Sequence, residues 1–227
     1  MNVARLLMSG ILMVHCMAVY AMQVQEHDTQ KRILFLSMDV SNLDPREGKI
    51  LALAALLTDE KLNVCSELYE VIGHPYEVVV SIDPYLKPKY LESGLRQQVL
   101  NSEVSMKQVN DKLAGILSNI PNTCGMAWLV GGNVINLYRE FLKEKLPEVN
   151  RLISYRKPIH IPTLRASALL FNEDDTFECA QQNEKGELKV PKNSLEEVRS
   201  LLDEYKYYRT RYFNSSPEQT FHDVDLK

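Results

Sequence analysis

A few carboxylates, one lysine and several aromatic side chains are the residues of this 227-residue chain whose types and spacing could do chemistry. Asp39 ends an apolar run with Asp44 in the following turn, and Glu196 and Glu197 begin a last helical segment. In isolation, such carboxylates are typical of turns and of the favourable first turn of a helix. The sequence has no Gly-rich phosphate loop, no dinucleotide fingerprint and no Cys/His cluster with zinc spacing. It therefore gives no indication of nucleoside triphosphate, dinucleotide or zinc chemistry.

The elements that must position these residues are predicted from the spacing of apolar side chains. Three continuous apolar runs separated by turns indicate strands at 33–38, 50–57 and 64–72. Two later apolar runs indicate shorter strands at 128–130 and 159–161. Apolar residues at helical spacing indicate helices over 90–100, 105–120, 135–146 and 195–213, and a further helix beginning at 163. Irregular segments are expected at 75–88 and 172–192. This order predicts an α/β fold in which helices sandwich a mixed β-sheet.

Length and composition predict one globular domain. Hydrophobic residues make up 45% of the chain and charged residues 25%, which excludes collagen-like and disordered classes. The net charge of −4 argues against a broad basic surface, so any contact with nucleic acid must be local. Four cysteines are too few for a disulfide scaffold of this size.

Residues 1–21 predict a secretory signal peptide, and a mitochondrial presequence is the alternative for the same segment. Arg5 precedes a long apolar run, and Val19 and Ala21 are the small residues that signal peptidase reads. The mature, secreted chain would have no membrane span. Its remaining cysteines, whose pairing stays open, are Cys65, Cys124 and Cys179. We expect a flexible arm over 22–31, a folded domain over 32–213 and a flexible tail over 214–227.

A series of short segments runs through the chain in an order typical of one enzyme family. They are Ser37–Pro45, Ile50–Asp59, Glu92–Leu95, Gly132–Asn133, Phe141–Leu142, Leu146–Glu148, Tyr155–Arg156, Thr163–Leu164 and Tyr207–Arg209. In order and spacing they resemble the oligoribonuclease family, which are 3′→5′ exoribonucleases of the DEDDh class. The resemblance spans roughly residues 33 to 213 and implies a ribonuclease H-like fold.

The resemblance also implies a mechanism and an assembly. Members of the family cut the terminal phosphodiester with two divalent metal ions held by four carboxylates, because Mg²⁺ and Mn²⁺ take oxygen ligands. A histidine on the last helix deprotonates the attacking water. The family forms homodimers, so the resemblance predicts a homodimer here.

Carried over position by position, the catalytic set of the family is mostly replaced. Ser37 and Asp39 stand where the first strand should carry Asp and Glu, and Tyr138 stands at the position of a third carboxylate. On the last helix, Lys192 replaces the histidine and Glu197 replaces the final Asp. The remnant catalytic and metal-binding residues are therefore Asp39 and Glu197.

The charge of such a site is too small for a pair of dications. Asp39 and Glu197 supply two negative charges where the family supplies four, and Lys192 adds a positive one. Like charges ~4 Å apart repel by about 4 kcal/mol at an effective dielectric constant of 20. We therefore expect no bound cofactor, with Mg²⁺ or Mn²⁺ only in an active protein. We also expect Lys192 to form a salt bridge with Asp39 or Glu197 in place of a metal.

Positions that shape the substrate site in the family are better kept. By resemblance, Met38 and Tyr85 match residues that stack on the terminal base, and Tyr155 and Arg156 match a pair that reaches the substrate phosphate. In the family that Tyr comes from the partner subunit. Without the resemblance, Tyr85 beside two prolines is more typical of loop packing.

Two functions remain open from the sequence. The first is a catalytically impaired pseudo-exonuclease that binds short RNA, nucleotides or a protein partner. The second is an active 3′→5′ exoribonuclease with a rearranged site built from Asp39, Glu197, Glu196 and Asp44.

Overall fold

The computed structural model describes residues 31–120, 126–133, 137–171, 177 and 191–213. The signal peptide predicted over 1–21 and the tail predicted over 214–227 lie outside the described residues, as do Cys124, Cys179 and all of the predicted arm except Lys31. Cys65 is an exposed, free thiol. Within these ranges, every helix is too short or too polar to cross a membrane.

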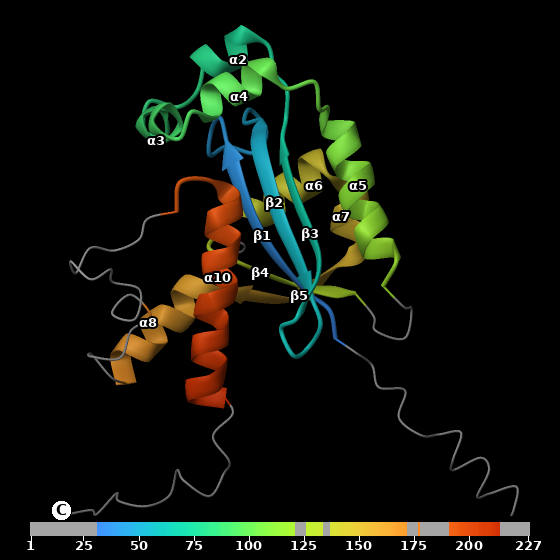
Figure 1. Cartoon of the computed structure of the whole chain (residues 1–227), viewed down its shortest axis with the longest axis vertical. Coiled ribbons are helices and arrows are strands. Elements are labelled where there is room, and N and C mark those ends of the chain that lie inside the picture. Colours follow the sequence, from blue (N-terminus) through green and yellow to red (C-terminus); the bar gives the residue numbers. More distant parts are fainter. Residues whose placement is uncertain (1–30, 121–125, 134–136, 172–176, 178–190, 214–227) are drawn as a thin grey trace, which may run out of the picture.

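A five-stranded mixed sheet forms the centre of the fold (Figure 1). In spatial order its strands are β3 (Val64–Val71), β2 (Ile50–Thr58), β1 (Ile33–Val40), β4 (Ala127–Gly131) and β5 (Ile153–His160). β1 pairs antiparallel with β2 and parallel with β4. β1 and β2 are apolar along nearly their whole length because both of their faces are buried. The predicted α/β fold with a mixed sheet is confirmed.

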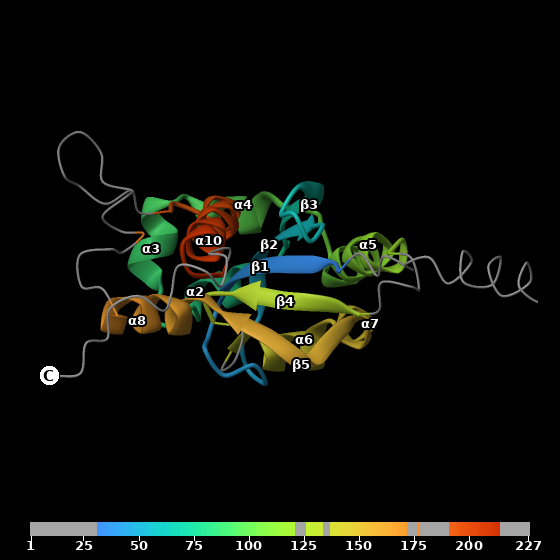
Figure 2. The same ribbon diagram turned by 90° about the horizontal axis from the view of Figure 1, so that it is seen from below.

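Helices cover both faces of the sheet and one of its ends. They are α2 (Tyr76–Val80), α3 (Lys87–Glu92), α4 (Leu95–Asn101), α5 (Met106–Ser118), α6 (Arg139–Lys145), α7 (Pro147–Leu152), α8 (Ile161–Phe171) and α10 (Ser194–Tyr208), which continues into a π-helical turn, η3 (Arg209–Phe213). Figure 2 shows α10 on one side of β1 and α6 on the other. Figure 1 shows α2, α3 and α4 gathered beyond the carboxyl end of β1.

Alternate side chains of β1 face these two helical layers. Leu34 and Leu36 belong to the core cluster that includes residues of α5, α6 and α7. Phe35 belongs to the opposite cluster, which contains Val198 and Leu202 of α10. Because side chains alternate along a strand, the two polar residues that continue the row of Phe35, Ser37 and Asp39, face α10.

The segment around α3 differs from the sequence prediction. The sequence predicts an irregular segment over 75–88 and one helix over 90–100, whereas the structure has three short helices between Tyr76 and Asn101. Gly94 adopts a left-handed conformation with φ of 71°, which ends α3 and starts α4 in a new direction. This turn lets α3 project over the end of β1.

α8 and α10 are held together by a partly buried ion pair. The guanidinium group of Arg165 on α8 donates two hydrogen bonds of 2.9 Å to the carboxylate of Glu204 on α10. Glu204 is almost fully buried, so this bidentate pair supplies the partner that a buried charge requires. β5 is longer than predicted and tolerates Pro158 because it lies at the sheet edge.

The end of β1 is fastened to α3 by one tyrosine. The β1–β2 register shifts between Asp39 and Val40, which is the signature of a bulge. The Tyr90 hydroxyl accepts a hydrogen bond from the Val40 N–H and donates one to the Val40 carbonyl, each 3.0 Å long. Both backbone groups are buried away from water, so the Tyr90 hydroxyl supplies the hydrogen-bond partner that each of them needs.

Replacing Tyr90 by Phe should therefore destabilise the fold. The variant would leave a buried N–H and a buried C=O without this partner, and we expect the free energy of unfolding to fall by about 1–3 kcal/mol in urea denaturation. Tyr76→Phe is the matched control, because Tyr76 is 65% exposed. Equal stability of Tyr90→Phe and the wild type would contradict the anchoring role.

Candidate functional site

The predicted remnant residues come together at the end of β1. Ser37 and Asp39 face α10, and Glu197 lies in the first turn of that helix. The helix begins where it does because the side chain of Asn193 accepts a hydrogen bond of 2.9 Å from the Glu196 N–H. This cap fixes Glu197 opposite the strand.

A lysine from α3 bridges the two carboxylates. The ammonium nitrogen of Lys89 is 2.9 Å from Oδ1 of Asp39 and 3.8 Å from Oε2 of Glu197. Asp39 is 2% exposed, whereas the lysine side chain is 44% exposed. Burial alone would lower the pKa of Lys89, but the charges of Asp39 and Glu197 outweigh it and raise that pKa. The lysine therefore stays charged and balances one of the two carboxylates.

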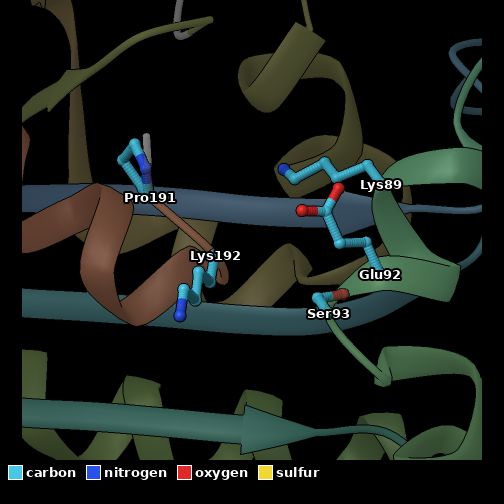
Figure 3. Close-up of a pocket in the computed structure, with 5 residues that line it drawn as sticks. All are labelled: Lys89, Glu92, Ser93, Pro191 and Lys192. Carbon is cyan, nitrogen blue, oxygen red and sulfur yellow. The ribbon is translucent and has the colours of Figure 1, made fainter. Parts of the chain in front are cut away.

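This finding corrects the expected role of Lys192. The sequence predicted a salt bridge between Lys192 and Asp39 or Glu197, but the described ion pairs of these carboxylates are made by Lys89. The backbone N–H of Lys192 donates to Oε2 of Glu196, and its side chain is exposed. In Figure 3 the Lys192 side chain points away from Lys89.

Tyr138 fills the position where a third carboxylate was expected. It lies directly before α6 and its side chain is 2% exposed, packed in the core below β1. Burial, followed by the charge of Glu197, raises the pKa of Tyr138, so its hydroxyl stays neutral. A neutral phenol therefore stands where the resemblance implies a charged carboxylate ligand.

The remaining polar groups of the site are also buried. Ser37 is fully buried beside Glu197 and Tyr138, and its hydroxyl partly offsets the rise in the pKa of each. Burial raises the pKa of Glu197, Lys89 opposes this effect, and Asp39 adds to it. Nearby negative charge and low exposure thus both disfavour a further anion here.

The donor set does not fit a pair of divalent ions. Across the ranges that the structure describes, no three His, Cys, Asp or Glu side chains are grouped so that they could hold a metal. Asp39 and Glu197 share one ammonium, which leaves the trio with a net charge of −1. A pair of Mg²⁺ or Mn²⁺ ions requires several anionic oxygens, and among the described residues the Lys89 ammonium pairs with just two carboxylates here.

The rearranged site considered from the sequence is not assembled either. Glu196 accepts the Lys192 N–H at the start of α10. Asp44 accepts two side-chain hydrogen bonds from Arg46, which lower the pKa of Asp44 to about 2. Neither carboxylate therefore joins Asp39.

A pocket of about 490 Å³ opens beside Lys89 (Figure 3). The described residues of its walls come from α3 and from the segment before α10, and they are Lys89, Glu92, Ser93, Pro191 and Lys192. In Figure 3 the carboxylate of Glu92 is turned toward Lys89. Lys192 thus belongs to the site as a pocket residue rather than as a partner of Asp39.

The residues expected to shape a substrate site differ in their exposure. Met38 is buried in the core, whereas Tyr85 is 83% exposed in the turn before α3. Tyr155 on β5 is also exposed, and the Arg139 guanidinium lies 5.0 Å from the centre of its ring. Arg156, the next residue on this edge strand, is exposed. The structure therefore leaves Tyr85 available for stacking but not Met38.

Sequence reasoning missed the roles of Lys89 and Tyr90, the two α3 residues that reach the end of β1. Each lies 50 residues from its partner on that strand, and the nearest segment of the resemblance begins only at Glu92. The one local signal was Pro88, since proline favours the first turn of a helix. That signal predicts a helix start but no contact with the site.

Comparisons with known proteins agree with this fold. No family model matches the chain. An oligoribonuclease of Corynebacterium glutamicum is 25% identical over 190 residues, which cover 83% of this chain and 83% of the relative. A probable oligoribonuclease of Drosophila melanogaster is 27% identical over 183 residues, which cover 80% of this chain and 82% of the relative.

A solved structure of exonuclease I from Methylocaldum szegediense superposes with a TM-score of 0.60 at 13% identity. The match covers 80% of this chain but 41% of the neighbour, so the chain spans less than half of that protein's length. At this identity the likeness shows the fold. The chain is therefore similar in sequence to oligoribonucleases, and it has the ribonuclease H-like fold seen in exonucleases.

Proposed function

We propose that this chain binds the ends of short oligoribonucleotides, or single nucleotides, without hydrolysing them. The observation that carries the proposal is the bridge from Lys89 to Asp39 and Glu197, with Tyr138 in place of a third carboxylate. Together these groups put an ammonium and a phenol where an exonuclease of this class needs metal ligands. The proposal thus assigns a binding role to the site.

Charge explains the loss of catalysis. Two-metal hydrolysis stabilises the attacking and the leaving oxygen with positive charge. Here the three bridging groups have a net charge of −1, so they supply no such positive charge to the attacking or the leaving oxygen. The histidine that would serve as base is replaced by Lys192, and losing a general base typically lowers the rate by a factor of roughly 10² to 10⁴.

The pocket supports a binding role. Lys192 lies on its wall with an exposed side chain, where an ammonium can contact a phosphate. The exposed ring of Tyr85 lies just before α3, the helix that forms the opposite wall. Base stacking on an aromatic ring contributes about 1–3 kcal/mol and tolerates any base. These features favour a nucleotide ligand over the protein partner.

The proposal also includes a homodimer and export from the cell. Exposed Tyr155 on the edge strand β5 is the residue that a partner subunit would receive in the expected homodimer. Export through residues 1–21 is the expected route, with mitochondrial import as the alternative.

An active exoribonuclease is the second candidate. It is favoured by the similarity to relatives named oligoribonuclease over about four-fifths of the chain. It requires Lys89 to leave Asp39 and Glu197 so that both carboxylates can serve as ligands.

Hydrolysis of a labelled dinucleotide separates the two functions. We expect the wild type with Mn²⁺ to release no more mononucleotide than Asp39→Ala, because Asp39 is occupied by Lys89. Product is followed by gel or chromatography over hours. Manganese-dependent turnover that disappears in Asp39→Ala would reverse the assignment and support the active enzyme.

RNA binding tests the pocket directly. A labelled oligoribonucleotide of a few nucleotides should bind in EDTA, with affinity measured by fluorescence anisotropy. Lys192→Ala should weaken binding several-fold and make the log–log salt slope shallower by about 0.7, the value for one phosphate contact on a single strand.

Lys107→Ala is the matched control, since Lys107 is an exposed lysine of α5 paired with Asp111. Tyr85→Ala should weaken binding without changing the salt slope, because a ring contributes stacking and not charge. Absence of binding by the wild type, or equal losses in Lys192→Ala and Lys107→Ala, would exclude this ligand class.

A further inference from the structure

We infer that the Lys89 ammonium is a built-in cation that keeps divalent ions out of the space between Asp39 and Glu197, and that its removal uncovers a site for one such ion. The inference rests on the proposed loss of the metal pair. It goes further because it assigns the exclusion of metal ions to Lys89. This residue belongs to α3, whereas the two carboxylates belong to β1 and α10.

The geometry places one ammonium group between two carboxylates, one on β1 and one on α10. Nζ of Lys89 is 2.9 Å from a carboxylate oxygen on β1 and 3.8 Å from a carboxylate oxygen on α10. In proteins Mg²⁺ binds carboxylates and water at about 2.0–2.1 Å. A dication bound to these oxygens would lie within a few ångströms of the ammonium, so the two cations exclude each other.

The lysine is held in this position by the residue next to it in the chain. Tyr90 exchanges two hydrogen bonds with Val40, while Lys89 bonds to Asp39, the preceding residue of β1. Two adjacent residues of α3 thus contact two adjacent residues of the strand end. The close-up in Figure 3 shows Lys89 extending from α3 across the sheet. This arrangement distinguishes it from a mobile surface lysine.

Charge balance predicts the effect of removing the ammonium. Asp39 is 2% exposed, so without Lys89 its carboxylate would remain buried without its cation. A single divalent ion would neutralise the two carboxylates. Mg²⁺ and Mn²⁺ keep several water ligands when one or two carboxylates hold them, and the adjoining pocket has room for those waters. Because Tyr138 is a neutral phenol, we expect one ion and not two.

The test is a titration of the full chain with Mn²⁺, in which free Mn²⁺ is measured by electron paramagnetic resonance. Lys89→Met keeps the aliphatic stem and removes the charge. We expect this variant to bind one Mn²⁺ at least tenfold more tightly than the wild type. Adding Asp39→Asn to Lys89→Met should abolish the gain. Lys107→Met, which removes an exposed lysine of α5, should bind like the wild type.

A second variant separates charge from packing. Lys89→Gln can still donate a hydrogen bond to Asp39 but has no charge, so it should also gain one ion. If either variant is less stable, Mn²⁺ should raise its melting temperature and leave that of the wild type unchanged. No gain of Mn²⁺ binding and no rise in melting temperature for either variant would overturn the inference.

The outcomes for this inference and for the proposed function are distinct. If neither the wild type nor the variants bind Mn²⁺, the inference fails while a non-hydrolytic function stands. If the wild type itself binds Mn²⁺ tightly, Lys89 excludes no ion and the inference fails. The dinucleotide assay then decides separately whether the protein is an active enzyme.

Discussion

The ion pair from Lys89 to Asp39 and Glu197 is the interaction on which the rest of the site depends. A carboxylate as buried as Asp39 destabilises a fold by several kcal/mol unless it is paired. α3 supplies the partner, and Tyr90 fixes that helix by binding the backbone at the bulge of β1. β1 with its bulge, α3 and the start of α10 therefore meet at this one cluster of charges.

At this cluster the fold resembles that of exonucleases, but the charged groups differ from those that two-metal catalysis requires. The sheet order and the helices on both faces are those of an oligoribonuclease-like exonuclease fold, but a fold does not fix an activity. A site that binds two metals is strongly anionic and becomes neutral only when it is loaded. Here an ammonium from the chain already balances part of the charge, and Tyr138 reduces the number of anions. This difference in charge is the basis on which we propose that the site binds a ligand without cutting it.

The sequence predicted the parts of this architecture that hydrophobic patterning controls. The apolar runs of β1 and β2 are buried on both faces, and such runs are recognisable without knowledge of the neighbours. The resemblance correctly placed Asp39 and Glu197 near one another. It did not identify their partner, because the contact between Lys89 and Asp39 joins residues 50 positions apart and no periodic pattern reports it. The break between α3 and α4 was missed because it depends on the left-handed backbone of Gly94.

A crystal structure after soaking in Mn²⁺, with anomalous scattering data, tests the central claim most directly. The account predicts that Lys89 keeps its contact with Asp39 and that no anomalous peak appears between β1 and α10. Two manganese peaks bound to Asp39 and Glu197, with the lysine displaced into the pocket, would contradict it.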